Sequence, residues 1–107
     1  MNNNFENAAA TLFDEMAAFF DELSTRAPDL DADFVDDSVF RLALDEGGEI
    51  LISKHESTAE IWLSAPNGGF HFRLENGKWL DTRDQKTLGD KITQSLAALG
   101  LNVKVPF

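Results

Sequence analysis

The sequence predicts an α+β fold, a two-layer sandwich in which two terminal helices pack on one face of an antiparallel sheet of about six strands. Apolar residues recur every three or four positions near both ends of the chain, and every second position between residues 29 and 84. The connections between candidate strands are too short for crossover helices, which excludes a parallel sheet. The chain has 107 residues, so we expect one domain, residues 1–107, with one core.

The first helix is expected over residues 4–25, where a wide apolar stripe follows the helical period. The stripe consists of Phe5, Ala9, Leu12, Phe13, Met16, Phe19, Phe20 and Leu23. An asparagine run before the stripe can cap the helix, and Pro28 stops it.

Six strands are expected in the central region, at Leu30–Val35, Val39–Asp45, Glu49–His55, Glu60–Ala65, Gly69–Glu75 and Lys78–Thr82. Asn-Gly and Gly-Gly pairs in the breaks supply the positive φ angles that tight hairpins need. A second helix is expected over Leu88–Leu99, where Thr87 and Asp90 form a capping-box pattern. The tail, residues 101–107, alternates apolar and polar residues, and we expect it to pack as an extended segment on the helices or the sheet.

Alternation along the strands predicts two different faces. The helix-facing set is Leu42, Leu44, Ile50, Ile52, Ile61, Leu63, Phe70, Phe72 and Leu74. The outward set is Ser53, His55, Glu60, Trp62, Ser64, His71 and Arg73. A β-bulge would shift these assignments.

The formal net charge is −10, which disfavours binding to nucleic acids and to anionic membranes. The expected partners are cations and basic protein surfaces. Absence of cysteine excludes disulfides, thiolate zinc sites and iron–sulfur ligation by this chain. No apolar run reaches membrane-spanning length and no secretory signal is evident, so we expect a cytoplasmic location.

Acidic residues gather in the first third of the chain. Packing of the first helix beside the first strand would place up to nine carboxylates on one ridge, from Asp14, Glu15, Asp21, Glu22, Asp29, Asp31, Asp33, Asp36 and Asp37. Carboxylate oxygens suit hard cations, and the spacing predicts several weak, open sites. The alternative is a solvated face that keeps the protein soluble. An EF-hand is rejected, because Phe34 and Phe40 stand where that loop needs glycine and glutamate.

Trp62 alternates with Ile61 and Leu63, so its indole is predicted to point away from the core. Exposed tryptophans are enriched at protein interfaces. The alternative is an indole that lies flat on its own sheet beneath long neighbours such as Arg73. The chain has two histidines, His55 and His71, without the partners of a metalloenzyme motif, and it has no nucleophile elbow, so we expect no enzyme.

The sequence resembles the frataxin family. The specific part is Trp62-Leu63-Ser64 followed by Gly68-Gly69-Phe70-His71-Phe72, with Trp79 and a closing helix downstream. The resemblance also covers the acidic first helix and strand and the apolar tail, nearly the whole chain.

The resemblance implies a protein that modulates iron–sulfur cluster assembly, as iron donor or as regulator. Implied partners are the cysteine desulfurase and the iron–sulfur scaffold protein, and the expected state is a monomer, with iron-driven oligomers left open. Weak binding of Fe2+ or Fe3+ at several sites is implied for Asp14, Asp21, Glu22, Asp29, Asp31, Asp33 and Asp37. Partner contacts are implied for Lys54, His55, Glu60, Trp62, His71 and Arg73.

Three segments depart from the family pattern. Ser53-Lys54-His55 replaces an Asn-Lys/Arg-Gln stretch, Glu60 replaces a common glutamine, and Ala17-Ala18 replaces acids of bacterial members. Two alternative functions are an acidic secretion chaperone, which would dimerise, and a ferroxidase, which needs bridging carboxylates and histidines.

Overall fold

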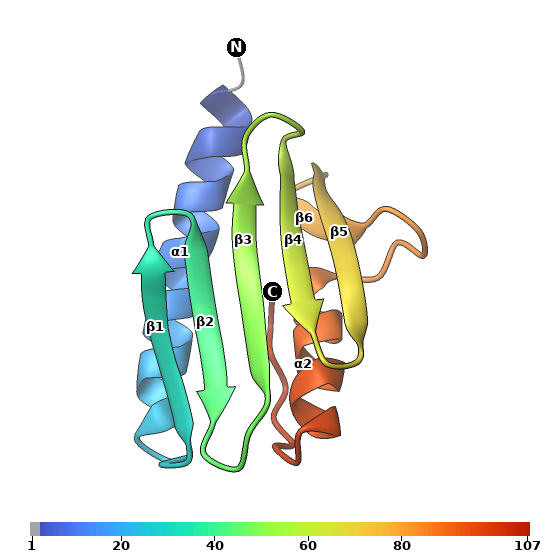
Figure 1. Ribbon diagram of the computed structural model, residues 1–107. Helices are drawn as coiled ribbons and strands as arrows, with labels where there is room; N and C mark the ends of the chain where they lie inside the picture. The colour runs from blue at the N-terminus through green and yellow to red at the C-terminus, as the bar shows by residue number, and fades with distance from the viewer. Residues whose placement is uncertain (1–2) are drawn as a thin grey trace.

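The computed structural model describes residues 3–107, with side chains from residue 4 onward, and contains the predicted two-layer sandwich (Figure 1). Its elements are α1 (Asn3–Ser24), β1 (Leu30–Asp36), β2 (Val39–Leu44), β3 (Glu49–His55), β4 (Glu60–Ala65), β5 (Gly68–Glu75), β6 (Lys78–Asp81) and α2 (Leu88–Ala98). All six strands form one antiparallel sheet in chain order, and both helices cover the same face. The predicted fold class is confirmed, and every predicted element lies within one or two residues of its expected bounds.

The hairpins follow the predicted turn chemistry. Asn76 and Gly77 connect β5 to β6 with φ angles of 53° and 79°. Positive φ at both central residues matches the right-handed twist of the flanking strands. The asparagine cap expected for α1 falls on Asn2, outside the described residues, since α1 begins at Asn3.

One irregularity interrupts the pairing of β1 with β2. Phe34 pairs with Phe40 and Asp36 pairs with Val39, so the register shifts around Val35. This bulge lies in the edge strand, close to the turn into β2. Bulges twist an edge strand and disrupt its hydrogen-bonding pattern, so they discourage pairing with another strand.

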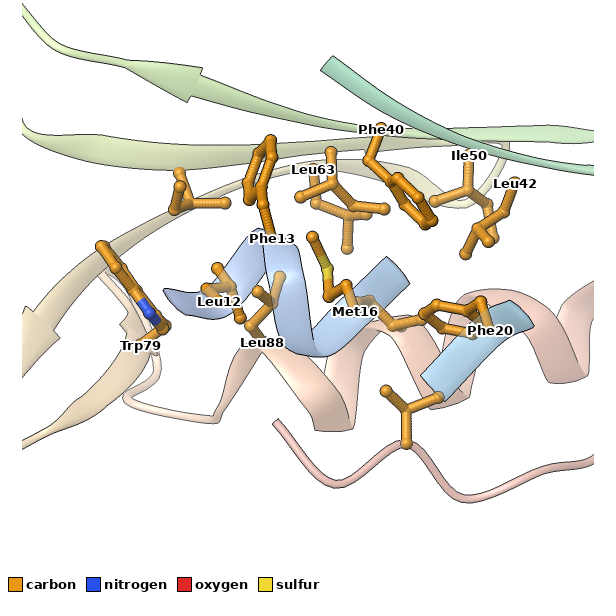
Figure 2. Close-up of a cluster of buried hydrophobic side chains, with 14 of the residues drawn as sticks. Leu12, Phe13, Met16, Phe20, Phe40, Leu42, Ile50, Leu63, Trp79 and Leu88 are labelled. Atoms are coloured by element: carbon orange, nitrogen blue, oxygen red, sulfur yellow. The ribbon is translucent and has the colours of Figure 1, made fainter. Parts of the chain in front are cut away.

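The core lies between the sheet and the helices (Figure 2). Leu12, Met16 and Phe20 of α1 are buried against the inner face of the sheet. The nine residues predicted to face the helices are all buried or packed against this core, which confirms the alternation. Trp79 is also a core residue, and its ring meets Phe5 edge-on at 5.8 Å between centroids.

Hydrogen bonds connect the first turns of α2 to the C-terminal tail. The predicted capping box is present, because Thr87 Oγ1 accepts from the Asp90 amide and the Asp90 carboxylate accepts from the Thr87 amide. The tail packs in an extended form, as expected, and Val105 is buried. The Gly89 amide donates to the Phe107 carbonyl at 3.1 Å, and the Val105 amide donates to Thr93 Oγ1 at 2.9 Å.

Gly89 permits this close approach of helix and tail. A Cβ atom there would lie 2.5 Å from the Val105 carbonyl oxygen and 2.6 Å from the Phe107 amide nitrogen. Both are backbone atoms, so relief requires the tail to move.

We therefore expect Gly89→Ala to lower the free energy of unfolding by about 1–3 kcal/mol, the usual cost of overpacking, despite the better helix propensity of alanine. Urea unfolding would measure the loss, and limited proteolysis would show faster cleavage within residues 101–107. Gln94→Ala, on the exposed side of α2, is the matched control and should leave both readouts unchanged. A Gly89→Ala protein as stable as the parent would show that the tail is not held at this point.

Candidate functional site: an acidic ridge and a tryptophan platform

The first candidate site is the acidic ridge, which we define as seven of the exposed carboxylates on α1, on β1 and in the turns before and after β1. They are Asp14, Asp21, Glu22, Asp29, Asp31, Asp33 and Asp37. The helical members lie on α1, which packs against β1, and Asp37 lies in the turn after β1. The helix α1 therefore packs beside β1, as the sequence predicts.

The spacing of Asp29, Asp31 and Asp33 at every second residue predicts that all three project from one face of a strand, and the structure corrects this for Asp29. Asp29 precedes β1 and lies in a turn, so it does not project from the strand. Asp31 and Asp33 alternate with Leu30 and Ala32, which pack on the core, so they lie on the open face of the sheet, away from the helices. The ridge therefore wraps around the edge of the sandwich, with helix acids on one side and strand acids on the other.

Arg41 interrupts the negative charge on the open face. It lies opposite Asp33 in the register, with 3.9 Å between its Nη1 and an Asp33 carboxylate oxygen, and its Nε donates to Glu49. The two carboxylates, with the Glu49 hydrogen bond foremost, raise the pKa of the Arg41 guanidinium. Sequence reasoning missed this pair. Because Asp36 pairs with Val39, an uninterrupted hairpin would place Phe34 opposite Arg41, and it is the bulge at Val35 that shifts the register and pairs Asp33 with Arg41.

Within residues 3–107, no group of three or more histidines, aspartates and glutamates is placed to hold a metal ion. A cation on the ridge would therefore have one or two carboxylates and otherwise water as ligands. Hard cations such as Mg2+ are often bound in this way, with most of their waters retained. The ridge suits weak, hydrated binding.

The second candidate site is the Trp62 platform on the open face, which we define as His55, Glu60, Trp62, His71 and Arg73. The Trp62 indole is stacked between two imidazoles, with centroids 3.7 Å from His55 and 4.3 Å from His71. The register explains the stack. His71 of β5 pairs directly with Trp62, and His55 of β3 is the diagonal neighbour of Trp62 on the other side. The indole is half-buried, with one histidine stacked on each of its faces.

Glu60 holds the platform together. Its side chain is only 8% exposed, although it lies on the open face. One carboxylate oxygen accepts from Trp62 Nε1 at 2.8 Å and the other from Arg73 Nε at 2.9 Å, while His71 Nδ1 lies 3.6 Å away. Burial by itself would raise the pKa of Glu60, but the hydrogen bonds from Trp62 and Arg73, with the nearby positive charge, outweigh it and lower that pKa.

Lys54 does not belong to this platform. It pairs with the core residue Ile61 in the register and therefore points toward the helical layer. There it lines a hollow with Asp14 and Asp37, and its Nζ lies 3.8 Å from Glu56. The resemblance grouped Lys54 with the platform through its position in the sequence, and the alternation of β3 separates it.

A cluster of charged residues surrounds the buried Lys91 on the helix-facing side, and sequence reasoning missed it. Lys91 of α2 is buried and donates to Asp84 at 2.7 Å, with a buried Asp81 oxygen 3.7 Å away. The hydrogen bond from Lys91, above all, lowers the pKa of Asp84. Asp81 is the last residue of β6 and Asp84 lies within the β6–α2 connection, so these contacts fasten the connection to α2 and have a structural role.

Comparisons with known proteins agree with this architecture. A family model described as a Frataxin-like domain matches residues 1–100. An iron-sulfur cluster assembly protein CyaY from Neisseria meningitidis is 33% identical over 96% of this chain and 94% of its own length. A CyaY from Haemophilus influenzae is 34% identical over 78% of this chain and 81% of its own.

Solved structures show the same fold. Frataxin from Psychromonas ingrahamii superposes with a TM-score of 0.79 at 19% identity, covering 97% of this chain and 95% of its own. Trimeric frataxin from Saccharomyces cerevisiae, complexed with ferrous iron, superposes with a TM-score of 0.74 at 29% identity, covering 85% and 83%. Sequence and fold together show that this chain belongs to the frataxin family and is similar to its bacterial CyaY members.

Proposed function

We propose that this protein modulates iron–sulfur cluster assembly, binding iron weakly on the acidic ridge and docking on the cysteine desulfurase complex. The observation that carries the proposal is a crowd of exposed carboxylates at one edge of a fold whose yeast relative is complexed with ferrous iron. The curated relatives are named as iron-sulfur cluster assembly proteins, which supports the same pathway. The protein would act as a monomer in the cytoplasm and without enzymatic turnover.

The ridge and the platform are arranged so that one partner can contact both. Asp31, Asp33 and Trp62 share the open face, on strands β1 and β4 of a sheet in chain order. Three strand spacings amount to about 14 Å, well within an interface of about 800 Å² per partner. The acids would steer a basic surface into register, and the half-buried indole would supply the anchor.

The iron proposal predicts selective broadening of NMR signals. Anaerobic titration of the 15N-labelled protein with ferrous iron should broaden amide signals from residues 14–37, because the paramagnetic ion is held by the ridge. The double variant Asp31→Asn/Asp33→Asn should lose broadening in β1 while α1 keeps it. Glu75→Asn, an exposed acid remote from β1, is the control. No localised change at millimolar iron would leave the acids as a docking or solubility surface.

Docking on the desulfurase should depend on both surfaces. Affinity measured by calorimetry should fall steeply between 50 and 300 mM salt. The Debye length shortens to about 10 Å at 0.1 M and about 8 Å at 0.15 M, which weakens the attraction between exposed charges on the two proteins. Trp62→Ala should weaken binding by about 2 kcal/mol or more, as expected for an interface anchor. Trp62→Phe, which keeps a ring in the stack, should recover part of that loss. A salt-independent dissociation constant would contradict docking through the acidic ridge. A Trp62→Ala protein that loses stability but binds normally would contradict the role of Trp62 as an anchor.

Glu60→Gln tests how the platform is held. Because its folded-state pKa is lowered, the ionised Glu60 stabilises the protein above its unfolded-state pKa of about 4.3, and this contribution is lost as the pH falls through the folded-state pKa. Glu60→Gln should therefore cost about 1–2 kcal/mol at pH 7, and the difference should shrink below about pH 4. Urea unfolding from pH 3.5 to 7.5 measures it. A constant difference across that range would show that the Glu60 charge does not stabilise the fold.

Oxygen consumption per iron in the isolated monomer separates this function from a ferroxidase. Iron-dependent consumption that follows turnover kinetics would favour an enzyme, and consumption no faster than iron in buffer would favour a carrier or regulator.

A further inference from the structure

Phe34 and Val35 are the large apolar residues that remain exposed within residues 4–107, at 45% and 58%. They lie at the bulge of edge strand β1, beside the turn into β2. The Phe34 ring contacts Phe40 at 5.0 Å and Phe13 at 6.1 Å between centroids. Aromatic packing therefore extends from the core to the surface at this point. There Phe34 and Val35 form an apolar patch that is exposed to solvent.

A small hollow opens beside the patch. Its volume is about 270 Å³, and its apolar walls are Ala9, Ala10 and Phe13 of α1 with Phe34 of β1. Pockets for small-molecule ligands usually measure about 300–1,000 Å³, so this one suits a single aliphatic side chain better than a cofactor. Asp14 and Asp37 also line it, so the walls combine apolar carbon with carboxylates.

The charge around the hollow selects the occupant. Asp14 and Asp37 line the hollow and are exposed, and the one lysine in the wall, Lys54, is already close to Glu56. A second copy of this chain carries a net charge of −10 and would be repelled. The bulge at Val35 also disfavours edge-to-edge pairing of two β1 strands. A basic partner is favoured on both counts.

We propose that this corner binds a basic segment of a partner protein that presents one apolar side chain between arginines or lysines. The apolar side chain enters the hollow against Phe13 and Phe34 and covers Val35, while the flanking cations pair with Asp14 and Asp37. The inference deepens the proposed function, on which it depends only for naming the cysteine desulfurase as the protein that carries the segment. It adds an apolar anchor to a contact otherwise described by charge.

Two synthetic peptides test the site directly. One has a single leucine at the centre of an arginine- and lysine-rich segment, and the other has serine in place of that leucine. Titrated into the 15N-labelled protein, the leucine peptide should shift amides of residues 9–14 and 34–37 saturably, and the serine peptide should bind about tenfold or more weakly. Equal affinities, or shifts centred on the Trp62 platform, would overturn the proposal.

Val35→Thr supplies the matched variant. It keeps the shape of an exposed side chain, so the urea midpoint should not change, but leucine-peptide affinity should fall about fourfold, the equivalent of one buried methyl group. Val103→Thr makes the same change on the tail and should leave peptide affinity intact. Unchanged peptide affinity in Val35→Thr would refute the proposal. It would also be refuted if sedimentation showed that the parent protein forms dimers through this corner and that Val35→Thr breaks the dimers without weakening peptide binding.

The same variants in the desulfurase titration separate the two proposals. One outcome is that binding of the desulfurase depends on salt and on Trp62 but is the same in Val35→Thr as in the parent. That result would reject the apolar anchor at the Phe34–Val35 corner and retain the proposed function. Binding of the leucine peptide without any binding of the desulfurase would retain the anchor and reject the desulfurase as its partner.

Discussion

The packing of the α1 stripe on one face of the sheet fixes where every functional side chain lies. Fully buried residues such as Met16 and Phe20 each contribute about 1.5–3 kcal/mol by leaving water. This burial commits the inner face of all six strands to the core. Because side chains alternate along a strand, the opposite face is committed just as firmly to solvent, and Trp62 is placed there as a consequence.

The same packing brings like charges together. α1 lies against β1, so carboxylates from the helix, the strand and the following turn share one edge of the molecule. Their mutual repulsion opposes folding and is offset only locally, for instance by Arg41 between Asp33 and Glu49. Binding of cations or of a basic protein relieves this repulsion, so the crowded carboxylates favour such binding.

The three surfaces differ in rigidity. The platform is held by a buried carboxylate and two stacked imidazoles, so Trp62 is presented to a partner with little conformational entropy left to lose. Ridge carboxylates are exposed and mostly unconstrained, as suits exchange of a weakly bound ion or long-range steering. The Phe34–Val35 corner lies between these extremes, apolar and partly packed, at the end of the ridge.

The sequence by itself determined the elements, their order, the two faces of the sheet and the capping box at Thr87, because these follow from local periodicity and short-range hydrogen bonding. Tertiary structure alone decided that Lys54 leaves the platform, that imidazoles enclose Trp62 and that the buried Lys91 meets Asp81 and Asp84. Each of these depends on strand register or on contacts between distant elements. Periodicity assigns a side chain to a face, but only the packed sheet determines which neighbours it meets there.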